Sequence, residues 1–130
     1  MTEHQIALAR RAVAAPGWRR LHGVRFVRPD GSYPLRMVGE GCYAHEGETG
    51  ISIPAATDLL PSDLPDLSDP LTALGLLALV RERWDLPNLA AVRKGDRWMF
   101  WADVGLPDAL YRLRAPTEVE VLVLALEVTP

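Results

Sequence analysis

The feature that most constrains the fold is a capped apolar segment that spans residues 68–84. Asp69, or the serine before it, suits the N-cap of a helix, and Pro70 suits the first turn, where its missing N–H costs no hydrogen bond. Residues 71–80 are apolar nearly all round, which predicts a central, buried helix. Gly75 in its middle is unfavourable by about 1 kcal/mol relative to alanine, so we expect a close packing partner there.

Strand-like sequence lies on both sides of this helix, and short turns join the strands. Residues 24–28 and 33–38 flank the turn Pro29-Asp30-Gly31-Ser32, in which proline suits the first turn position and glycine a position with positive φ. Residues 90–93 and 97–101 flank a second turn built around Gly95. Tight turns of this kind join antiparallel strands. Pro34 cannot donate a ladder hydrogen bond, which suggests that its strand lies at the edge of a sheet.

The remaining segments carry weaker signals. Thr2 and Gln5 form a capping box for a first helix that Pro16-Gly17 ends. We expect short strands around Tyr43 and Ser52, and a third strand after the second hairpin, over residues 109–114, where apolar and polar side chains alternate.

The C-terminal segment is the most ambiguous, because its many valines favour a strand. The cap at Thr117 and Glu120 and the apolar spacing of the segment predict a helix instead. Val121 and Leu124 would then lie off the main buried stripe, which raises the alternative of a homodimer through the C-terminal helix.

These elements predict a single α+β domain over residues 1–130, with antiparallel strands, packed helices and the order α-ββ(β)-α-βββ-α. Residues 57–69 form a Pro/Asp-rich connecting strap. The layout of a helix followed by a hairpin occurs twice, which suggests a weak internal duplication.

The bulk composition is that of a globular protein. Hydrophobic residues make up 48% of the chain, and a domain of 130 residues buries a core without disulfides or metals. The single Cys42 cannot form an internal disulfide, and the first residues lack the basic start and apolar stretch of a signal peptide. We therefore expect a protein of the cytoplasm, with no membrane contact.

The net charge of −3 conceals a strong segregation. Residues 1–36 hold seven arginines against two acids, a net charge of +5, whereas residues 37–70 hold seven acids and no base, a net charge of −7. Two interpretations remain open. The two segments pair within the fold, which we favour, or they form opposed patches that face partners.

Asp63, Asp66 and Asp69 recur at a spacing of three within the strap. The neighbouring prolines favour polyproline II, in which these carboxylates would form one row roughly 9 Å apart. That separation is too large for one metal ion, whose oxygen ligands lie at about 2.0–2.6 Å. Leu64 and Leu67 form a second row that we expect to dock on the body of the protein.

Catalytic and metal-binding motifs are weak. Cys42 and His45, with Glu46 beside them, form a C-x-x-H pair, but neither of the other histidines sits in a matching pair. The sequence holds no phosphate-binding loop of the P-loop type and no G-x-S-x-G. We therefore expect no metal, no cofactor and no enzymatic activity.

Candidate interaction residues fall into three groups. The N-terminal arginines, together with nearby aromatic residues, suggest a nucleic-acid surface, although a pI near 5.6 argues against it. Alternation along residues 97–101 puts two aromatic side chains on one strand face and leaves one on the other, where it is either covered or an exposed hot spot. The candidates are Arg19, Arg20, Arg25, Arg28, Trp98, Trp101, Asp63 and Asp66.

Five stretches, in order along the chain, carry a resemblance: residues 7–13, 17–19, 66–75, 77–82 and 117–127. Together they are similar to a group of small phage and prophage proteins that have no assigned activity. The last helix departs from that group in its valines, where the group has more alanine. The resemblance implies a phage-type origin and a compact α/β layout, and it assigns no catalytic or binding residue.

We therefore expect a small, non-enzymatic accessory protein of phage type that acts by protein–protein contact on a host or phage machine. The alternative is a nucleic-acid-associated protein that uses the N-terminal arginines.

Overall fold

The computed structural model describes residues 1–32, 34–39, 42–45, 52–54, 62–128 and 130. The fold is α+β, with antiparallel sheets, as the sequence predicts. The helices are α1 (Glu3–Ala14), α3 (Pro70–Trp84), α4 (Asp108–Tyr111) and α5 (Glu118–Glu127). The strands are β1 (Arg25–Val27), β2 (Leu35–Gly39), β3 (Cys42–His45), β4 (Ser52–Pro54), β5 (Leu64–Pro65), β6 (Ala90–Lys94) and β7 (Arg97–Trp101).

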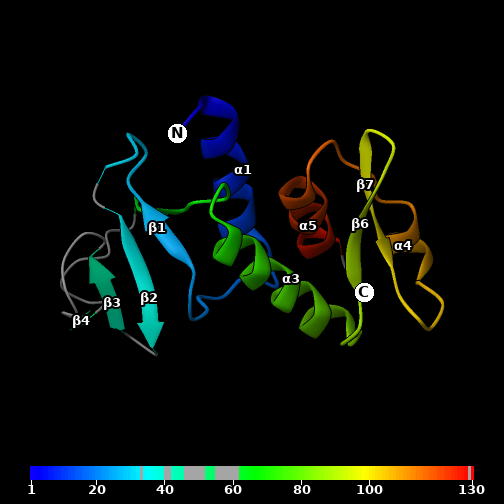
Figure 1. Ribbon diagram of the computed structural model, residues 1–130. Helices are drawn as coiled ribbons and strands as arrows, with labels where there is room; N and C mark the ends of the chain where they lie inside the picture. The colour runs from blue at the N-terminus through cyan, green and yellow to red at the C-terminus, as the bar shows by residue number, and fades with distance from the viewer. Residues whose placement is uncertain (33, 40–41, 46–51, 55–61, 129) are drawn as a thin grey trace.

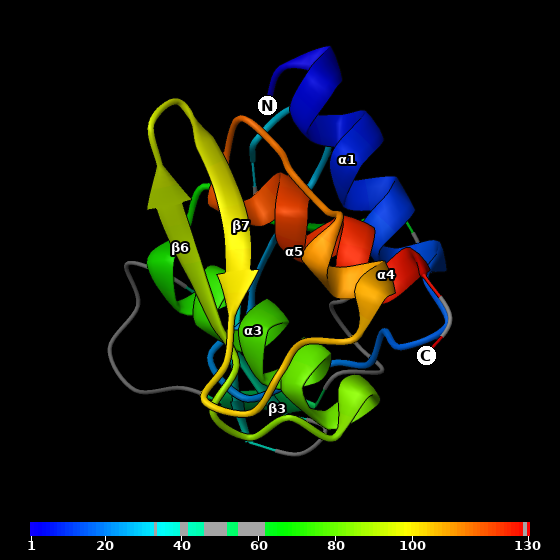
Figure 2. The same ribbon diagram turned by 90° about the vertical axis from the view of Figure 1, so that its right-hand side faces the viewer.

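Three helices separate two sheets. Figure 1 shows α1, α3 and α5 between the larger sheet on one side and the β6–β7 hairpin on the other. The larger sheet has five strands in the order β4-β3-β2-β1-β5, and the second sheet consists of β6 and β7 alone. Figure 2, turned by 90°, places the hairpin in front of α3 and α5. The two helix-then-hairpin halves therefore end in separate sheets.

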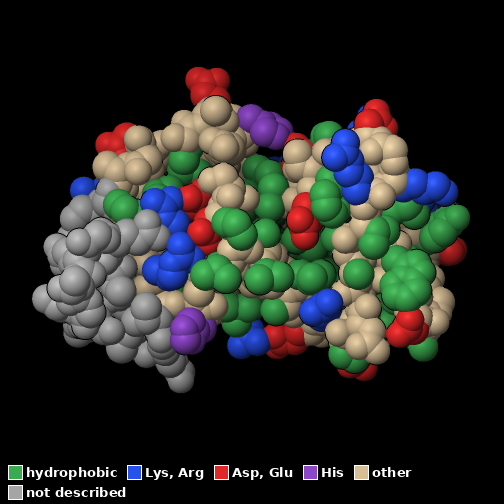
Figure 3. Space-filling model, viewed as in Figure 1, with side chains coloured by type: hydrophobic (Ala, Val, Ile, Leu, Met, Phe, Trp, Pro, Cys, Tyr) green, Lys and Arg blue, Asp and Glu red, His purple; other side chains and the backbone are tan. Residues whose placement is uncertain are grey.

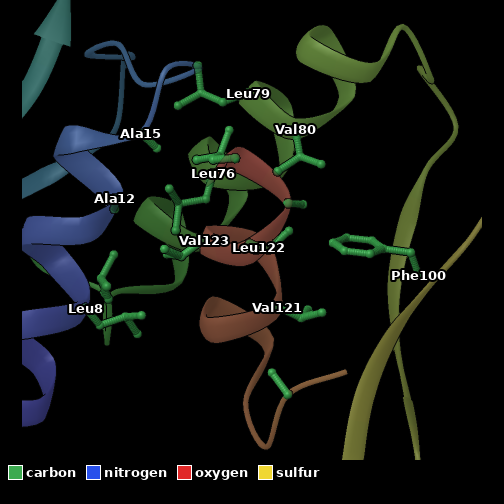
Figure 4. Close-up of a cluster of buried hydrophobic side chains, with 14 of the residues drawn as sticks. Leu8, Ala12, Ala15, Leu76, Leu79, Val80, Phe100, Val121, Leu122 and Val123 are labelled. Atoms are coloured by element: carbon green, nitrogen blue, oxygen red, sulfur yellow. The ribbon is translucent and has the colours of Figure 1, made fainter. Parts of the chain in front are cut away.

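Helix α5 lies at the centre of the core. Its buried residues are Val121, Leu122, Val123, Ala125 and Leu126, each with 0% of its surface exposed. Figure 4 shows α1 on one side of α5 and Phe100 of β7 on the other, with Leu76, Leu79 and Val80 of α3 above it. Because neighbours cover it on several sides, nearly every position of its middle is apolar, which explains the valines that made this segment look like a strand.

Polar contacts hold both ends of α5. At its N-terminus Thr117 accepts a hydrogen bond from the Glu120 backbone N–H at 3.3 Å, so the predicted cap is confirmed. At its C-terminal end the indole Nε1 of Trp84 donates to the Ala125 carbonyl at 2.9 Å. Carbonyls in the last turn of a helix lack an intrahelical partner, so this buried bond satisfies one of them and ties α3 to α5.

The start of α3 forms as the sequence predicts. Asp69 is its N-cap and accepts from the Thr72 backbone N–H at 3.0 Å, with Pro70 in the first turn. A Cβ added at Gly75 would lie 3.0 Å from a methyl carbon of Val24. The helix therefore approaches the segment that leads into β1 closely, and this contact is the packing partner expected for the glycine.

The burial of α3 differs from the expectation of a central helix. Leu71 is 49% exposed and Leu74 60% exposed, while Leu76, Leu79 and Val80 are buried. One face of α3 packs on α5, and the opposite face lies at the surface of the described structure. The apolar sequence of α3 did not distinguish it from α5, because exposed leucines look the same as buried ones in a sequence.

The predicted strand over residues 109–114 is wrong. Residues 108–111 form the short helix α4, in which Leu110 and Tyr111 donate backbone hydrogen bonds to the Pro107 carbonyl at 3.0 Å. Leu110 is fully buried and Leu113 is half-buried. A spacing of three between apolar residues fits one face of a helical turn, so the short alternating pattern admitted both structures.

The dimer alternative rested on a second apolar face of α5, and that face is buried within the chain. Figure 4 shows Val121 on the side of the helix that faces the hairpin. Val121 is 0% exposed, and Leu124 is only partly exposed. The hairpin therefore occupies the position that a second copy of the chain would need.

We predict that Val121→Thr lowers the free energy of unfolding by about 1–3 kcal/mol, because it buries a hydroxyl in an apolar core at nearly constant volume. Val104→Thr makes the same change at a side chain that is 64% exposed and should alter stability by less than about 0.5 kcal/mol. Denaturant unfolding measures both values. A lower mass of the Val121 variant in sedimentation would contradict this assignment and place Val121 in a subunit interface.

Candidate interaction surface

The strap and the first hairpin are joined by ion pairs that the strand register dictates. Strand β5 runs antiparallel to β1, with Val27 opposite Leu64 and Phe26 opposite Pro65. Extending this register by one residue at each end puts Arg25 opposite Asp66 and Arg28 opposite Asp63. Cross-strand neighbours of opposite charge stabilise an antiparallel pair.

Both of these charge pairs form. The Arg25 guanidinium donates to the Asp66 carboxylate, and the Asp66 backbone N–H donates to the Arg25 carbonyl at 2.7 Å. Arg28 Nε lies 3.9 Å from Asp63 Oδ1, and the Asp63 side chain is only 1% exposed. Four of the candidate interaction residues therefore contact one another inside the fold.

A third arginine completes the set. Arg36 on β2 lies directly opposite Arg25 on β1, an arrangement that is unfavourable for two like charges. Arg36 donates two hydrogen bonds to Asp69, at 2.9 and 3.0 Å, while Arg25 is bound to Asp66. Each guanidinium thus has its own carboxylate. For these pairs, the basic and acidic segments meet within the fold, which is the interpretation that we favoured.

At the described end of the strap, the backbone does not adopt the predicted polyproline II conformation. Leu64 and Pro65 form a strand at the edge of the sheet, where a proline breaks no ladder hydrogen bond. Side chains three residues apart along a strand point to opposite faces, so Asp63 and Asp66, which flank β5, do not form one row. Leu64 and Leu67 are buried against the helical core, as expected, and residues 57–61 lie outside the described part of the strap.

The remaining N-terminal candidates lie at the surface. Arg19 contacts Glu82 on α3, and both side chains are well exposed, at 59% and 60%. An ion pair with that exposure contributes at most about 1 kcal/mol. Arg20 is exposed beside it. Because Arg25, Arg28 and Arg36 face carboxylates of the strap, the basic surface of the first third is smaller than its seven arginines suggest.

The second hairpin presents two different faces. Its register pairs Ala91 with Phe100 and Arg93 with Trp98 on one face, and Phe100 is only 1% exposed. Trp98 is half-buried, and its backbone is bridged to Ala115 by hydrogen bonds of 2.7 and 3.2 Å. This inner face packs on α5, which contacts both strands of the hairpin.

The outer face of the hairpin is apolar and exposed. The same register places Ala90 opposite Trp101 and Val92 opposite Met99. Trp101 is 54% exposed and Val92 36% exposed, and Met99 is half-buried. In Figure 2 none of the labelled elements lies over the hairpin. The sequence left open whether the second aromatic face is covered, and within the described structure it is exposed.

Charge is distributed unevenly along this hairpin. Arg93, Lys94 and Arg97 are exposed at its tip, with Asp96 in the turn between them. Figure 3 shows Lys and Arg side chains around the upper end of the hairpin and hydrophobic side chains below them. At the opposite, open end lies a pocket of about 160 Å³, lined by Leu86, Pro87, Leu89, Ala102 and Val104 together with Asp85, Asn88 and Asp103.

We define the hairpin surface as Val92, Lys94, Arg97, Met99 and Trp101. Only Trp101 of this set was a candidate from the sequence. The sequence could have identified the other four residues as neighbours of Trp101. The turn at Gly95 fixes the register of residues 90–101, and the register determines which side chains share a face. The sequence could not show which of the two faces is buried, because that depends on the position of α5.

A second polar group lies between the starts of α1 and α5. His4 Nε2 is 2.8 Å from Glu120 Oε1, and His4 borders a pocket that Ser68 also lines. The Ser68 hydroxyl donates to Asp66 at 2.6 Å, and within the described residues no hydrogen bond joins it to His4. The group therefore connects two helices and does not form a nucleophile paired with a base.

The described residues contain no group of three or more His, Cys, Asp and Glu side chains arranged to hold a metal ion. The side chains of Cys42 and His45, and all of Glu46, lie outside the described part of the chain. None of the described helices is long and apolar enough to cross a membrane. Comparisons with protein-family models, curated proteins and solved structures found no match to this chain.

The Arg36 guanidinium, which is hydrogen-bonded to Asp69, lowers the pKa of that carboxyl below its ordinary value, and bonds from Thr72 lower it further. A lowered pKa in the folded state stabilises the fold above the unfolded pKa of about 3.9. That contribution is lost as the pH falls through the folded pKa.

We predict that Asp69→Asn lowers the free energy of unfolding at pH 7 by about 1.5–3 kcal/mol, the worth of a hydrogen bond to a charged group. Asparagine caps helices as well as aspartate, so this variant removes the charge and keeps the cap. The difference from the parent should shrink as the pH falls below about 4, which denaturant unfolding at several pH values measures. A difference independent of pH would show that the carboxylate charge is not the cause.

Proposed function

We propose that this chain is a small, non-enzymatic accessory protein of phage type that binds another protein through the hairpin surface. The observation that carries the proposal is Trp101, an aromatic side chain that is 54% exposed on an uncovered sheet face. Val92 and Met99 extend the apolar area beside it, and Lys94 and Arg97 border it. Tryptophan, methionine and arginine are enriched at protein interfaces, and hot spots are enriched in tryptophan, tyrosine and arginine.

The placement of this face supports a binding role. The inner face of the hairpin is held on α5 by Phe100, so the outer side chains stand on a supported element and not on a free loop. A rigid presentation lowers the ordering cost that association must overcome. The phage-type origin rests on the sequence resemblance alone.

Nucleic-acid binding by the N-terminal arginines has less support. Arg25 and Arg36 are hydrogen-bonded to carboxylates, and Arg28 lies beside Asp63, so phosphate would have to displace partners that the fold supplies. A salt-dependent gel shift that Arg19→Ala/Arg20→Ala abolishes would favour this alternative over protein binding.

We predict that Trp101→Ala weakens partner binding by about 2 kcal/mol or more, which is roughly thirty-fold in Kd. Leu74→Ala is the matched control, because Leu74 is 60% exposed and apolar but lies on α3. The parent and both variants are immobilised and exposed to host lysate, and the bound proteins are quantified by mass spectrometry. A partner is a protein that the parent and the Leu74 variant retain and the Trp101 variant loses.

Two results would contradict the proposal. One is a set of specifically captured proteins that Trp101→Ala leaves unchanged and Leu74→Ala removes, which would move the interface to α3. The other is the absence of any specific capture by the parent. Near-UV circular dichroism of each variant verifies that the fold is retained before capture is compared.

A further inference from the structure

Within the described residues, no other strand pairs with the outer edge of β6. The turn closes with Lys94 opposite Arg97, and in a hairpin with a two-residue turn this pair exchanges both of its hydrogen bonds. Hydrogen-bonded and non-hydrogen-bonded pairs alternate along an antiparallel hairpin. The backbone N–H and C=O groups of Ala91 and Arg93 therefore point away from β7. Within the described chain, these groups make no backbone hydrogen bond outside the hairpin.

The other edge of the hairpin verifies this alternation. Trp98 lies opposite Arg93, so its backbone groups must also point outward, away from β6. They do, and they are bonded to Ala115. The β7 edge is therefore occupied at Trp98 by the chain's own backbone, while the equivalent groups of β6 have the geometry to pair with another strand.

Charge selects the kind of strand that fits and its direction. The tip carries Arg93, Lys94 and Arg97 against Asp96, whereas the open end carries Asp85 and Asp103 beside an apolar pocket. An extended segment along β6 meets positive charge at one end and negative charge with apolar surface at the other. A segment with acidic residues at the tip and apolar residues towards the open end complements both ends.

Resting on the proposed function, we propose that the partner supplies an extended, acidic segment that pairs antiparallel with β6 as a third strand. In this direction its acidic residues come first, beside Lys94 and Arg97, and its apolar residues follow, beside Val92 and the pocket. All strand pairs of the described structure are antiparallel, and the outward groups of Ala91 and Arg93 supply the hydrogen bonds.

The test uses the full chain and a capped peptide, Glu-Glu-Val-Thr-Val-Thr-Val. A matched peptide replaces both glutamates by lysine. In ¹⁵N NMR titrations the acidic peptide should cause saturable shifts at the amides of residues 90–94, weakened by added salt, and the lysine peptide should bind at least about tenfold more weakly.

Two variants separate the backbone from the charge contribution. Ala91→Pro removes an outward N–H without removing a hydrogen bond to β7. It should weaken binding of the acidic peptide about tenfold, which corresponds to the loss of one hydrogen bond. Lys94→Glu/Arg97→Glu keeps the edge and should reverse the preference between the two peptides. Both variants should retain the spectrum of the parent away from the hairpin.

Several outcomes would overturn the added strand: no binding, shifts outside β6, equal binding to Ala91→Pro, or displacement of the peptide by an oligothymidylate that shifts the same amides. Failure here is distinguishable from failure of the proposed function. If a captured partner is lost with Trp101→Ala but kept with Ala91→Pro, the hairpin surface binds protein and the third strand does not form.

Discussion

The structure depends on the burial of the apolar residues of α5, five of which are 0% exposed. This helix contacts α1, α3 and both strands of the second hairpin. Without it, an isolated two-stranded hairpin would be marginal in water, and the helices would lack a shared apolar partner. Because Phe100 anchors the hairpin on α5, the hairpin is stable with only one of its faces packed. Within the described chain, the outer face of the hairpin is therefore not needed for packing.

The strap connects this helical core to the larger sheet. Leu64 and Leu67 are buried among the helices, while the backbone of β5 pairs with β1. The carboxylates of the strap bind arginines of the first hairpin, so one short segment contributes apolar, backbone and ionic contacts together. We expect these partly buried charge pairs to help select one register, because a slip by one residue would leave Arg25 and Asp66 without each other.

The sequence predicted local features well, because their causes are local. The caps at Thr2, Asp69 and Thr117 and the turn at Gly95 each follow from a side chain or a φ angle within a few residues. It predicted the three-dimensional placement less well. The proline before β2 suggested an edge strand, but β2 lies inside the sheet. The proline is tolerated there because it precedes the first paired residue of β2.

The main error has a physical origin. The expectation that α3 is the central helix came from an apolar run whose partners lie far away in the sequence. The same limit applies to the candidate site. Arg25 and Asp66 looked like interaction residues because a sequence shows charge without its partner, whereas Val92 and Met99 were not candidates from the sequence. Burial changes the meaning of both groups, and it follows from the position of α5 and not from residue type.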